Sequence, residues 1–357
     1  MTPTIFDRAP MRVYWEVTRS CALACRHCRA EASSARDPDE LTLAEGRAVL
    51  DRIAAFADPK PHVILTGGDP LEREDLFELI AHARGVGLGV SVSPSATPRL
   101  TPGVVERLAL AGVDAVSLSI DGSSAQRHDA LRGVDGCFAR TLTAAHAAAS
   151  AALQAQVNTL VCAETLDDLE AIWNLVRELR LARWSLFFLV TVGRGAVLEP
   201  IGAGQAEVLL RWLASLARGG GLPVVTTTEA PQFRRVLIEQ DGRSHSAGGS
   251  SSHSGRRGHG VRDGNGVMFI SHSGEVSPSG FLPISAGNVR RDDLVDTYRS
   301  APVFVALRRA NSFGGRCGRC EYREICGGSR ARAWSATGDA LAEDPLCAYE
   351  PQAHLGP

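Results

Sequence analysis

Short apolar runs alternate with longer helical patterns from residue 12 to about residue 220. The apolar runs predict six strands, at residues 12–17, 62–66, 88–93, 115–120, 155–161 and 185–190. Repeated strand–helix units predict an α/β fold with a parallel sheet and right-handed crossovers. Six such units would form a partial, TIM-like (β/α)6 barrel, in which chemistry collects at the C-terminal ends of the strands.

The helices between these strands have recognisable starts. Thr42 and Glu45 have the spacing of a capping box ahead of an apolar stripe. Thr101 and Pro102 place a cap and a proline at the start of another helix. Apolar residues recur at helical spacing between residues 169 and 179. These signals support the alternation of strands and helices.

The last third of the chain has a different pattern. Residues 242–260 contain no apolar residue larger than alanine, which predicts a flexible loop. We interpret its histidines, His245, His253 and His259, as part of a solvated loop rather than as a metal site. Residues 266–290 predict a β-hairpin, with an apolar run at 267–270 and a turn at Ser273 and Gly274.

These patterns divide the chain of 357 residues into four parts. Residues 1–11 form an N-terminal extension and residues 12–225 the partial barrel. Residues 226–265 form a linker that contains the flexible loop at 242–260, and residues 266–357 form a small C-terminal domain. A chain of this length can bury a barrel-sized core and carry an appendage.

Composition excludes several classes of partner. Hydrophobic residues make up 44% and charged residues 22%, as in ordinary soluble domains. The net charge of -2 predicts neither a nucleic-acid partner nor an anionic membrane surface. Neither a transmembrane run nor a signal peptide is visible, so a cytoplasmic location is expected. In a reducing compartment, the nine cysteines are expected to be metal ligands rather than disulfides.

Cys21, Cys25 and Cys28 form a C-x3-C-x2-C motif directly after the first predicted strand. Three thiolates suit a 4Fe–4S cluster in which the fourth iron stays open for another ligand. The alternative is a zinc site with His27 as the fourth ligand. We favour the cluster, because His27 lies too close in sequence to its neighbouring cysteines.

A second group of cysteines has the spacing C-x2-C-x5-C-x20-C and comprises Cys317, Cys320, Cys326 and Cys347. Four thiolates can fill all the corners of a second 4Fe–4S cluster, and a closed tetrahedral zinc site is the alternative. The remaining cysteines, Cys137 and Cys162, stand alone and are expected to be buried as small hydrophobic residues.

With Thr66-Gly67-Gly68-Asp69-Pro70 after the second strand, these motifs resemble those of radical S-adenosylmethionine (radical SAM) enzymes with a C-terminal SPASM or twitch domain. The resemblance extends over nearly the whole chain. It implies that Cys21, Cys25 and Cys28 hold the SAM-binding 4Fe–4S cluster. It also implies that Gly67, Gly68 and Asp69 hold the methionine amino group. Here an aspartate stands where a glutamate is usual.

The same resemblance implies further contacts to S-adenosylmethionine. His27 stands where an aromatic ring usually packs near the adenine. Arg132 resembles the arginine that pairs with the methionine carboxylate. The other expected contacts lie at strand ends and are Ser93, Ser119 and Asn158.

A full SPASM domain carries seven cysteines and two auxiliary clusters. This chain keeps the four cysteines of the outer cluster, while Ser279, Asp292 and Arg330 stand where others would be expected. The resemblance therefore implies one auxiliary 4Fe–4S cluster, held by Cys317, Cys320, Cys326 and Cys347. A fully ligated cluster has no site for substrate, so its expected role is electron transfer.

The tail from Cys326 to Cys347 resembles that of members that modify tetrapyrroles in the alternative heme and d-type heme pathways. The implied activity is reductive cleavage of S-adenosylmethionine to a 5′-deoxyadenosyl radical, which abstracts a substrate hydrogen. Removal or trimming of propionates by oxidative decarboxylation is the preferred outcome. Arg330 and Arg332 would either meet substrate carboxylates or stabilise the charge of the auxiliary cluster.

Other functions remain as alternatives. One alternative is an enzyme that matures a ribosomally made peptide. Another is an enzyme that dehydrogenates or decarboxylates a small molecule. The non-enzyme alternatives are an iron–sulfur electron carrier and a zinc-binding scaffold, neither of which needs Gly67-Gly68-Asp69. A radical SAM enzyme also needs a reductant, and a flavodoxin or ferredoxin is the expected partner.

Overall fold

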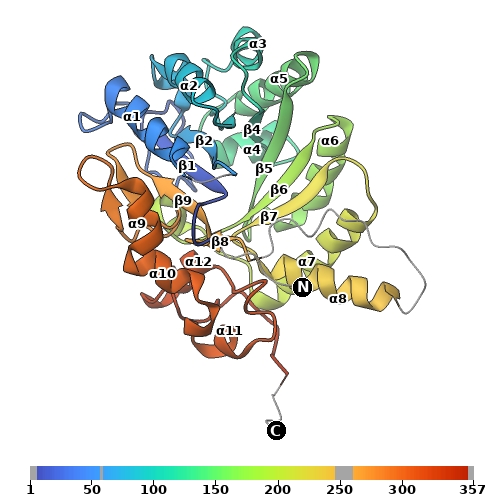
Figure 1. Ribbon diagram of the computed structural model, residues 1–357. Coiled ribbons are helices and arrows are strands. Elements are labelled where there is room, and N and C mark those ends of the chain that lie inside the picture. The colour runs from blue at the N-terminus through green and yellow to red at the C-terminus, as the bar shows by residue number, and fades with distance from the viewer. Residues whose placement is uncertain (1–5, 57–58, 246–259, 353–357) are drawn as a thin grey trace.

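One sheet runs through the computed structural model, which describes residues 6–56, 59–245 and 260–352 (Figure 1). The strand order is β11-β10-β9-β1-β2-β3-β4-β5-β6-β7, with β8 beside β9. The first seven strands are parallel and follow the order of the chain. They are β1 (Arg12–Thr18), β2 (His62–Gly67), β3 (Val90–Val92), β4 (Ala115–Ser119), β5 (Gln154–Val161), β6 (Arg183–Phe188) and β7 (Val224–Thr228).

The predicted α/β fold with a partial barrel is confirmed. Each of the six predicted strands has its counterpart in β1 to β6. The sheet also contains β7, which the sequence pattern did not predict. This strand reads Val-Val-Thr-Thr-Thr, so its β-branched residues favour a strand, but it lacks the long apolar run of the others.

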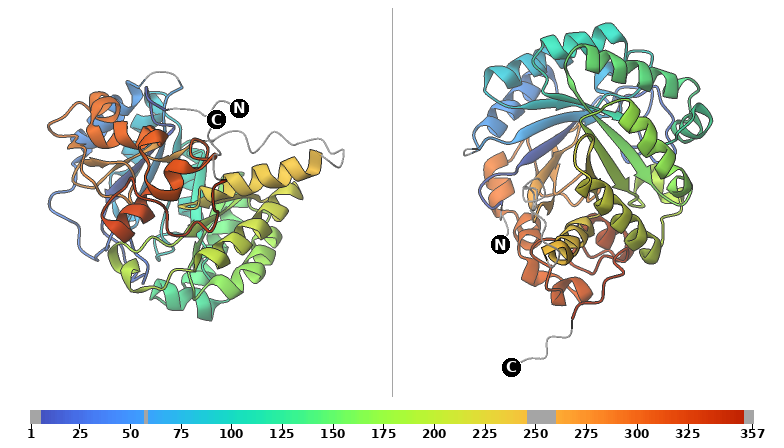
Figure 2. Two further views of the ribbon diagram at one scale, coloured as in Figure 1. Left: turned by 90° about the horizontal axis from the view of Figure 1, so that it is seen from below. Right: turned by 90° about the vertical axis from the view of Figure 1, so that its right-hand side faces the viewer.

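Most of the helices between the barrel strands cover their outer side (Figure 2), whereas the helix that contains Leu131 and Arg132 lies at the C-terminal ends of the strands. Thr42 and Glu45 close the predicted capping box, and the Thr101 side chain accepts a hydrogen bond from Val104 N. The helices are α1 (Leu43–Ala54), α2 (Leu76–Gly85), α3 (Pro102–Leu110), α4 (Ala125–Arg132), α5 (Cys137–Ser150), α6 (Leu169–Glu178), α7 (Ala203–Arg218) and α8 (Gln232–His245).

The two faces of the barrel strands differ in polarity. On β1, Val13, Trp15 and Val17 are fully buried and belong to the main hydrophobic core. The alternating residues are polar or aromatic: Arg12 and Tyr14 are half-buried and Glu16 is buried. Alternate residues of a strand point to opposite faces, so the apolar set packs under the helices and the polar set faces the barrel interior.

The C-terminal region continues the same sheet. Strand β9 (Gly266–Ile270) pairs in parallel with β1 and antiparallel with β10 (Glu275–Ser277), which confirms the predicted hairpin. The other elements are β8 (Arg262–Asp263), β11 (Gly287–Asn288), α9 (Leu294–Ser300), α10 (Pro302–Arg308), α11 (Gly315–Arg319) and α12 (Arg330–Thr337). Strand β1 is therefore paired along both edges.

The predicted loop at 242–260 needs one correction. Residues 242–245 lie in α8, because the helix continues past its last large apolar residue, Ile238, for two further turns. Residues 246–259, with His253 and His259, lie outside the described residues. The division of the chain at residues 225 and 266 stays a prediction.

No helix among the described residues is long and apolar enough to span a membrane.

Gly46 in α1 offers a test of the packing between this helix and the sheet. A Cβ atom at this position would lie 2.9 Å from side-chain atoms of both Trp15 and Leu79. We expect Gly46→Ala to lower the melting temperature, because overpacking a buried contact costs about 1–3 kcal/mol.

Gly204→Ala in α7 is the matched control, because nothing lies within 4 Å of its added Cβ. Its melting temperature should be unchanged or slightly higher, since alanine is the better helix former. Thermal unfolding followed by circular dichroism measures both variants. Equal effects of the two substitutions would contradict the packing argument.

Candidate active site

The three N-terminal cysteines line a cavity of about 220 Å³ at the C-terminal ends of the strands. Cys21 and Cys25 are buried and Cys28 is half-buried. The structure brings most of the predicted cofactor contacts to the same cavity, whose lining includes His27, Gly67, Gly68, Ser119, Arg132 and Asn158. Residues that are far apart in the sequence thus surround the cysteine loop.

The glycine motif after β2 holds one side of the cysteine loop. Gly68 N donates to Thr18 O at 2.9 Å, and Asp69 N donates to Ser20 O at 2.8 Å. A Cβ on Gly68 would lie 2.4 Å from Ser20 O, and one on Gly67 would lie 2.2 Å from Thr18 O. Only glycine permits this approach of two backbones, which fixes where the loop leaves β1.

Arg194 and two further glycines hold the other side of the loop. Arg194 N donates to Cys28 O at 3.0 Å, and its Nε donates to Cys25 O at 2.9 Å. Gly193 has a φ of 53°, and its added Cβ would lie 2.7 Å from Cys28 O. Gly133, with a φ of 71°, packs in the same way against Ala24 O. The cysteine backbone is thus clamped from two sides.

The surroundings of the thiols suit metal-bound thiolates. Leu23 N donates to Cys21 Sγ and Ala32 N to Cys28 Sγ, each at 3.4 Å, while Arg132 Nη1 lies 3.8 Å from Cys25 Sγ. Such donors stabilise negative sulfur. Without a metal, burial raises the pKa of Cys21 to about 11. The three sulfurs and their donors therefore fit an iron–sulfur cluster.

Three nitrogens at this cavity are buried without a hydrogen-bond partner among the described residues. They are His27 Nδ1, Arg132 Nε and Arg194 Nη2. Burial and the nearby Arg132 charge lower the pKa of His27 to about 4, so its ring is neutral. Orphaned polar atoms beside a cavity are the expected partners of a polar cofactor, so the residues present fit S-adenosylmethionine as well.

Two predicted contacts, Asp69 and Ser93, do not line the cavity. Asp69 is fully buried, and its carboxylate accepts hydrogen bonds from Leu71 N, Ser95 N and Thr97 Oγ1. Burial raises its pKa to about 6. Ser95 lines the cavity and donates to Gly68 O at 2.7 Å. The aspartate thus positions the backbone of its own turn and the neighbouring loop.

Arg132 already has a carboxylate partner. Its Nη2 pairs with Asp121, a residue at the end of β4 that also lines the cavity. Burial, the largest single influence, would raise the pKa of Asp121, but the Arg132 charge, the nearby histidines and the hydrogen bond from Leu160 N together outweigh it and hold the pKa at about 2. Sequence reasoning missed Asp121 and Arg194 as cavity residues. Asp121-Gly122 directly after a strand was the available signal for the first.

The four C-terminal cysteines line a second cavity together. Tyr322 N donates to Cys320 Sγ and Gly328 N to Cys326 Sγ, each at 3.4 Å. Burial raises the pKa of Cys326 to about 12 and that of Cys347 to about 11. Among the described residues, no three metal-binding side chains are grouped closely enough to hold a single metal ion. As predicted, Cys137 and Cys162 are fully buried. Neither lines either of these two cavities, although Cys137 packs beside Cys21 and Cys25.

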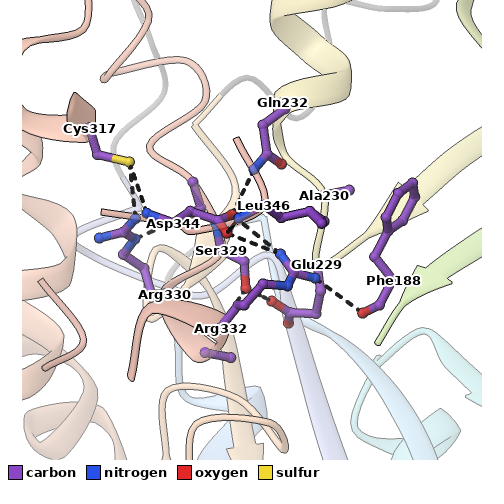
Figure 3. Close-up of polar contacts among 12 residues, drawn as sticks. Phe188, Glu229, Ala230, Gln232, Cys317, Ser329, Arg330, Arg332, Asp344 and Leu346 are labelled. Atoms are coloured by element: carbon purple, nitrogen blue, oxygen red, sulfur yellow. Dashed lines mark hydrogen bonds and ion pairs between the residues drawn. The ribbon is translucent and has the colours of Figure 1, made fainter. Parts of the chain in front are cut away.

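The guanidinium groups of Arg330 and Arg332 form hydrogen bonds and an ion pair within the protein (Figure 3). Arg330 is fully buried, donates to Ala340 O and Ala342 O, and lies 3.5 Å from Cys317 Sγ. Arg332 pairs with Asp344 at 3.3 Å and donates to Phe188 O at the end of β6. Neither arginine lines the first cavity. Two roles were predicted for these arginines: binding substrate carboxylates or stabilising the charge of the auxiliary cluster. The position of Arg330 beside Cys317 fits the second role.

The fold and the site define the class of the protein. A model of the radical SAM superfamily matches residues 15–176, and the chain belongs to this superfamily. It is therefore an enzyme that uses S-adenosylmethionine and a 4Fe–4S cluster.

Particular relatives sharpen this assignment. The AdoMet-dependent heme synthase of Methanosarcina barkeri is 36% identical over 344 residues, with 96% of this chain and 97% of that protein covered. That of Nitratidesulfovibrio vulgaris is 37% identical, with 98% and 95% covered. Streptococcus suis SuiB bound to S-adenosylmethionine has a TM-score of 0.74 at 16% identity, over 96% of this chain and 78% of that one. This last likeness shows the fold alone.

Gly68 offers a direct test of the clamp on the cysteine loop. We expect Gly68→Ala to reduce the release of 5′-deoxyadenosine at least ~100-fold, because a displacement of about 1 Å at a reacting centre has this effect. The measurement is anaerobic incubation of reconstituted protein with S-adenosylmethionine and dithionite. Gly103→Ala, with nothing within 4 Å of its added Cβ, is the control. Wild-type activity in Gly68→Ala would refute the clamp.

Proposed function

We propose that this enzyme oxidatively decarboxylates propionate side chains of an iron tetrapyrrole. The observation that carries the proposal is the similarity to AdoMet-dependent heme synthases at 36–37% identity over almost the whole chain. The similarity extends over both groups of cysteines and the region between them, where a substrate must be recognised.

The net reaction removes carbon dioxide and leaves a vinyl group. Each propionate, –CH2–CH2–COO⁻, would lose a hydrogen atom from the carbon next to the ring. This hydrogen atom is transferred to the 5′-deoxyadenosyl radical, which becomes 5′-deoxyadenosine. Loss of carbon dioxide and of one electron then gives –CH=CH2. The electron needs an acceptor, and the C–S bond of S-adenosylmethionine needs one electron to break.

The residues of the first cavity would hold the reagents for this reaction. Cys21, Cys25 and Cys28 would bind the cluster, and the backbone of Gly67 and Gly68 would receive the methionine amino group. When bound, the cluster and S-adenosylmethionine together supply the radical that takes the substrate hydrogen. We keep His27, Ser119 and Asn158 as further contacts, because all three line the cavity.

The wall of the first cavity would exclude water from the reacting groups. Part of its lining is apolar and includes Leu160, Phe187, Phe188, Val190 and Phe281. Phe281 comes from the C-terminal region, so the barrel and the tail both enclose the site. An apolar wall around a reactive radical prevents its quenching by solvent and by exchangeable protons.

The second group of cysteines would hold one auxiliary 4Fe–4S cluster. Four sulfurs at one cavity, with amide donors to Cys317, Cys320 and Cys326, support this ligand set. When bound, such a cluster supplies a one-electron acceptor. Arg330 beside Cys317 would favour its reduced, more negative state.

Maturation of a peptide is the second candidate. The SuiB structure has also been determined with the precursor peptide SuiA, and its fold resembles this one. The likeness to SuiB at 16% identity is one of fold alone. A mycofactocin maturase at 33% identity and a PqqA peptide cyclase at 28% are less similar to this chain than the heme synthases at 36–37%, so the tetrapyrrole is favoured. We further propose a flavodoxin or ferredoxin as the reductant. A cytoplasmic location is proposed because free cysteines and clusters need a reducing compartment.

The test is anaerobic turnover of iron coproporphyrin III by fully reconstituted protein. Loss of carbon dioxide, appearance of vinyl groups by mass spectrometry and one 5′-deoxyadenosine per vinyl group would support the proposal. Iron analysis should give about eight irons per chain if both clusters are present. Release of 5′-deoxyadenosine with unchanged porphyrin would rule out this substrate.

Two cysteine variants separate the roles of the two clusters. Cys25→Ala is expected to abolish cleavage of S-adenosylmethionine, because one ligand of the open cluster is lost. Cys320→Ala should retain cleavage but lose most vinyl formation. Iron counts of the two variants, together with product ratios, check this expectation. Full turnover by Cys320→Ala would remove the auxiliary cluster from the mechanism.

A further inference from the structure

The arginines that line the first cavity differ in their hydrogen bonds. They are Arg29, Arg132 and Arg194. Arg132 pairs with Asp121 and is the expected partner of the methionine carboxylate. Arg194 holds the cysteine loop, because its guanidinium donates to two backbone carbonyl oxygens of that loop. Arg29 has neither task, although it lines the same cavity.

Three separate segments hold the side chain of Arg29 in place. Its Nη2 pairs with Glu16 on β1 at 2.9 Å. Its guanidinium carbon lies 4.7 Å from the centre of the Phe269 ring on β9, an arrangement that attracts a cation to the ring face. A Cβ added to Gly280 would lie 3.0 Å from Arg29 Nε. The C-terminal region thus helps to fix a charged side chain beside the N-terminal cysteines.

Arg29 keeps hydrogen-bond donors for a ligand. A guanidinium has five N–H donors, and the contacts of Arg29 with Glu16 and Gly280 O use two of them. Its Nε has no hydrogen-bond partner among the described residues and is not buried, and the side chain is 20% exposed. A fixed guanidinium with open donors is suited to a carboxylate, which it binds through two parallel hydrogen bonds.

The negative charge of Glu16 is shared between Arg29 and His272. Glu16 Oε1 lies 2.8 Å from His272 Nδ1, and His272 Nε2 lies 3.2 Å from Asp37 Oδ2. Both ring nitrogens face carboxylates, which favours the charged ring with two N–H donors. Burial would lower the pKa of His272, but Glu16 and Asp37 outweigh it and raise the pKa. Part of the positive charge of Arg29 therefore remains available to a ligand.

The position of Arg29 suits the reacting end of the substrate. It directly follows Cys28, a predicted ligand of the cluster at which the radical would be generated. The same cavity has Phe187 and Phe281 in its lining. A propionate that enters it brings an anionic carboxylate into partly apolar surroundings, which is unfavourable without a hydrogen-bonding partner. The open donors of Arg29 can supply this partner.

We propose that Arg29 binds the carboxylate of the propionate that is being decarboxylated, and that Glu16 and His272 are positioning residues for Arg29. This inference rests on the proposed function. The contact would fix the nearby carbon, from which the hydrogen atom is taken, relative to the cavity. It would also favour a propionate over a vinyl group. Because the carboxylate departs as carbon dioxide, the contact ends with the reaction and the vinyl product is released from it.

The test compares the binding of two iron porphyrins, measured by absorbance titration of the reconstituted enzyme under anaerobic conditions. Iron protoporphyrin IX has vinyl groups in place of two of the propionates of iron coproporphyrin III. We expect Arg29→Gln to weaken binding of iron coproporphyrin III about 10-fold, as for loss of a charge-assisted hydrogen bond. Binding of iron protoporphyrin IX should be unchanged. Arg29→Lys should recover part of the loss, because it keeps the charge but not the paired donors.

Arg26→Gln is the matched control, because Arg26 lies in the same cysteine loop and pairs with Glu164 but does not line the cavity. It should bind both porphyrins like the wild type. Iron content checks the folding of each variant. His272→Gln leaves the cysteine loop unchanged and keeps the test valid if Arg29→Gln loses iron. It should weaken binding of iron coproporphyrin III alone, by a smaller factor than Arg29→Gln.

The outcomes separate the carboxylate contact from the proposed function. If Arg29→Gln binds iron coproporphyrin III like the wild type, or loses affinity for both porphyrins equally, the contact is overturned even if the wild type decarboxylates the substrate. Arg29-dependent binding without decarboxylation would overturn the proposed function alone. No binding of iron coproporphyrin III by the wild type would overturn both.

Discussion

The close approach of two backbones at the ends of β1 and β2 is the constraint on which the site depends. Gly67 and Gly68 bring the second strand end within hydrogen-bonding distance of Thr18 and Ser20, directly before Cys21. Any side chain at these glycines would occupy the place of a carbonyl oxygen. The cysteine loop therefore starts from a fixed point, and Arg194 fixes its far end. The backbone that carries the three cysteines is thus held at both ends relative to the barrel strands.

A second buried constraint joins the tail to the barrel. Asp344 is fully buried and accepts hydrogen bonds from Gln232 Nε2 and Ser329 N, while it pairs with Arg332. A buried charge is tolerated only when such partners replace water. The same aspartate donates its backbone N–H to Cys317 Sγ, so one residue links the wall at Phe188, through Arg332, to the second group of cysteines.

The fold was largely predictable from the sequence, since strand periodicity and helix caps are local signals. Strand β7 was missed because its polar threonines do not form an apolar run. The grouping of the cysteines around two cavities was also predictable from their spacing, whereas their role as cluster ligands stays a prediction. The orientation of Asp69 and the pairing of Arg132 with Asp121 were not predictable. Each depends on contacts between residues that only the folded sheet brings together.

The pairing of β1 along both edges has a consequence for how the protein is built. The strand before the cysteine loop receives β2 on one side and β9, from beyond residue 265, on the other. A chain ending before β9 would leave the N–H and C=O groups of Arg12 to Trp15 as an open sheet edge, which invites aggregation. Removal of the C-terminal region would therefore expose an edge of the strand that leads directly into the cysteine loop.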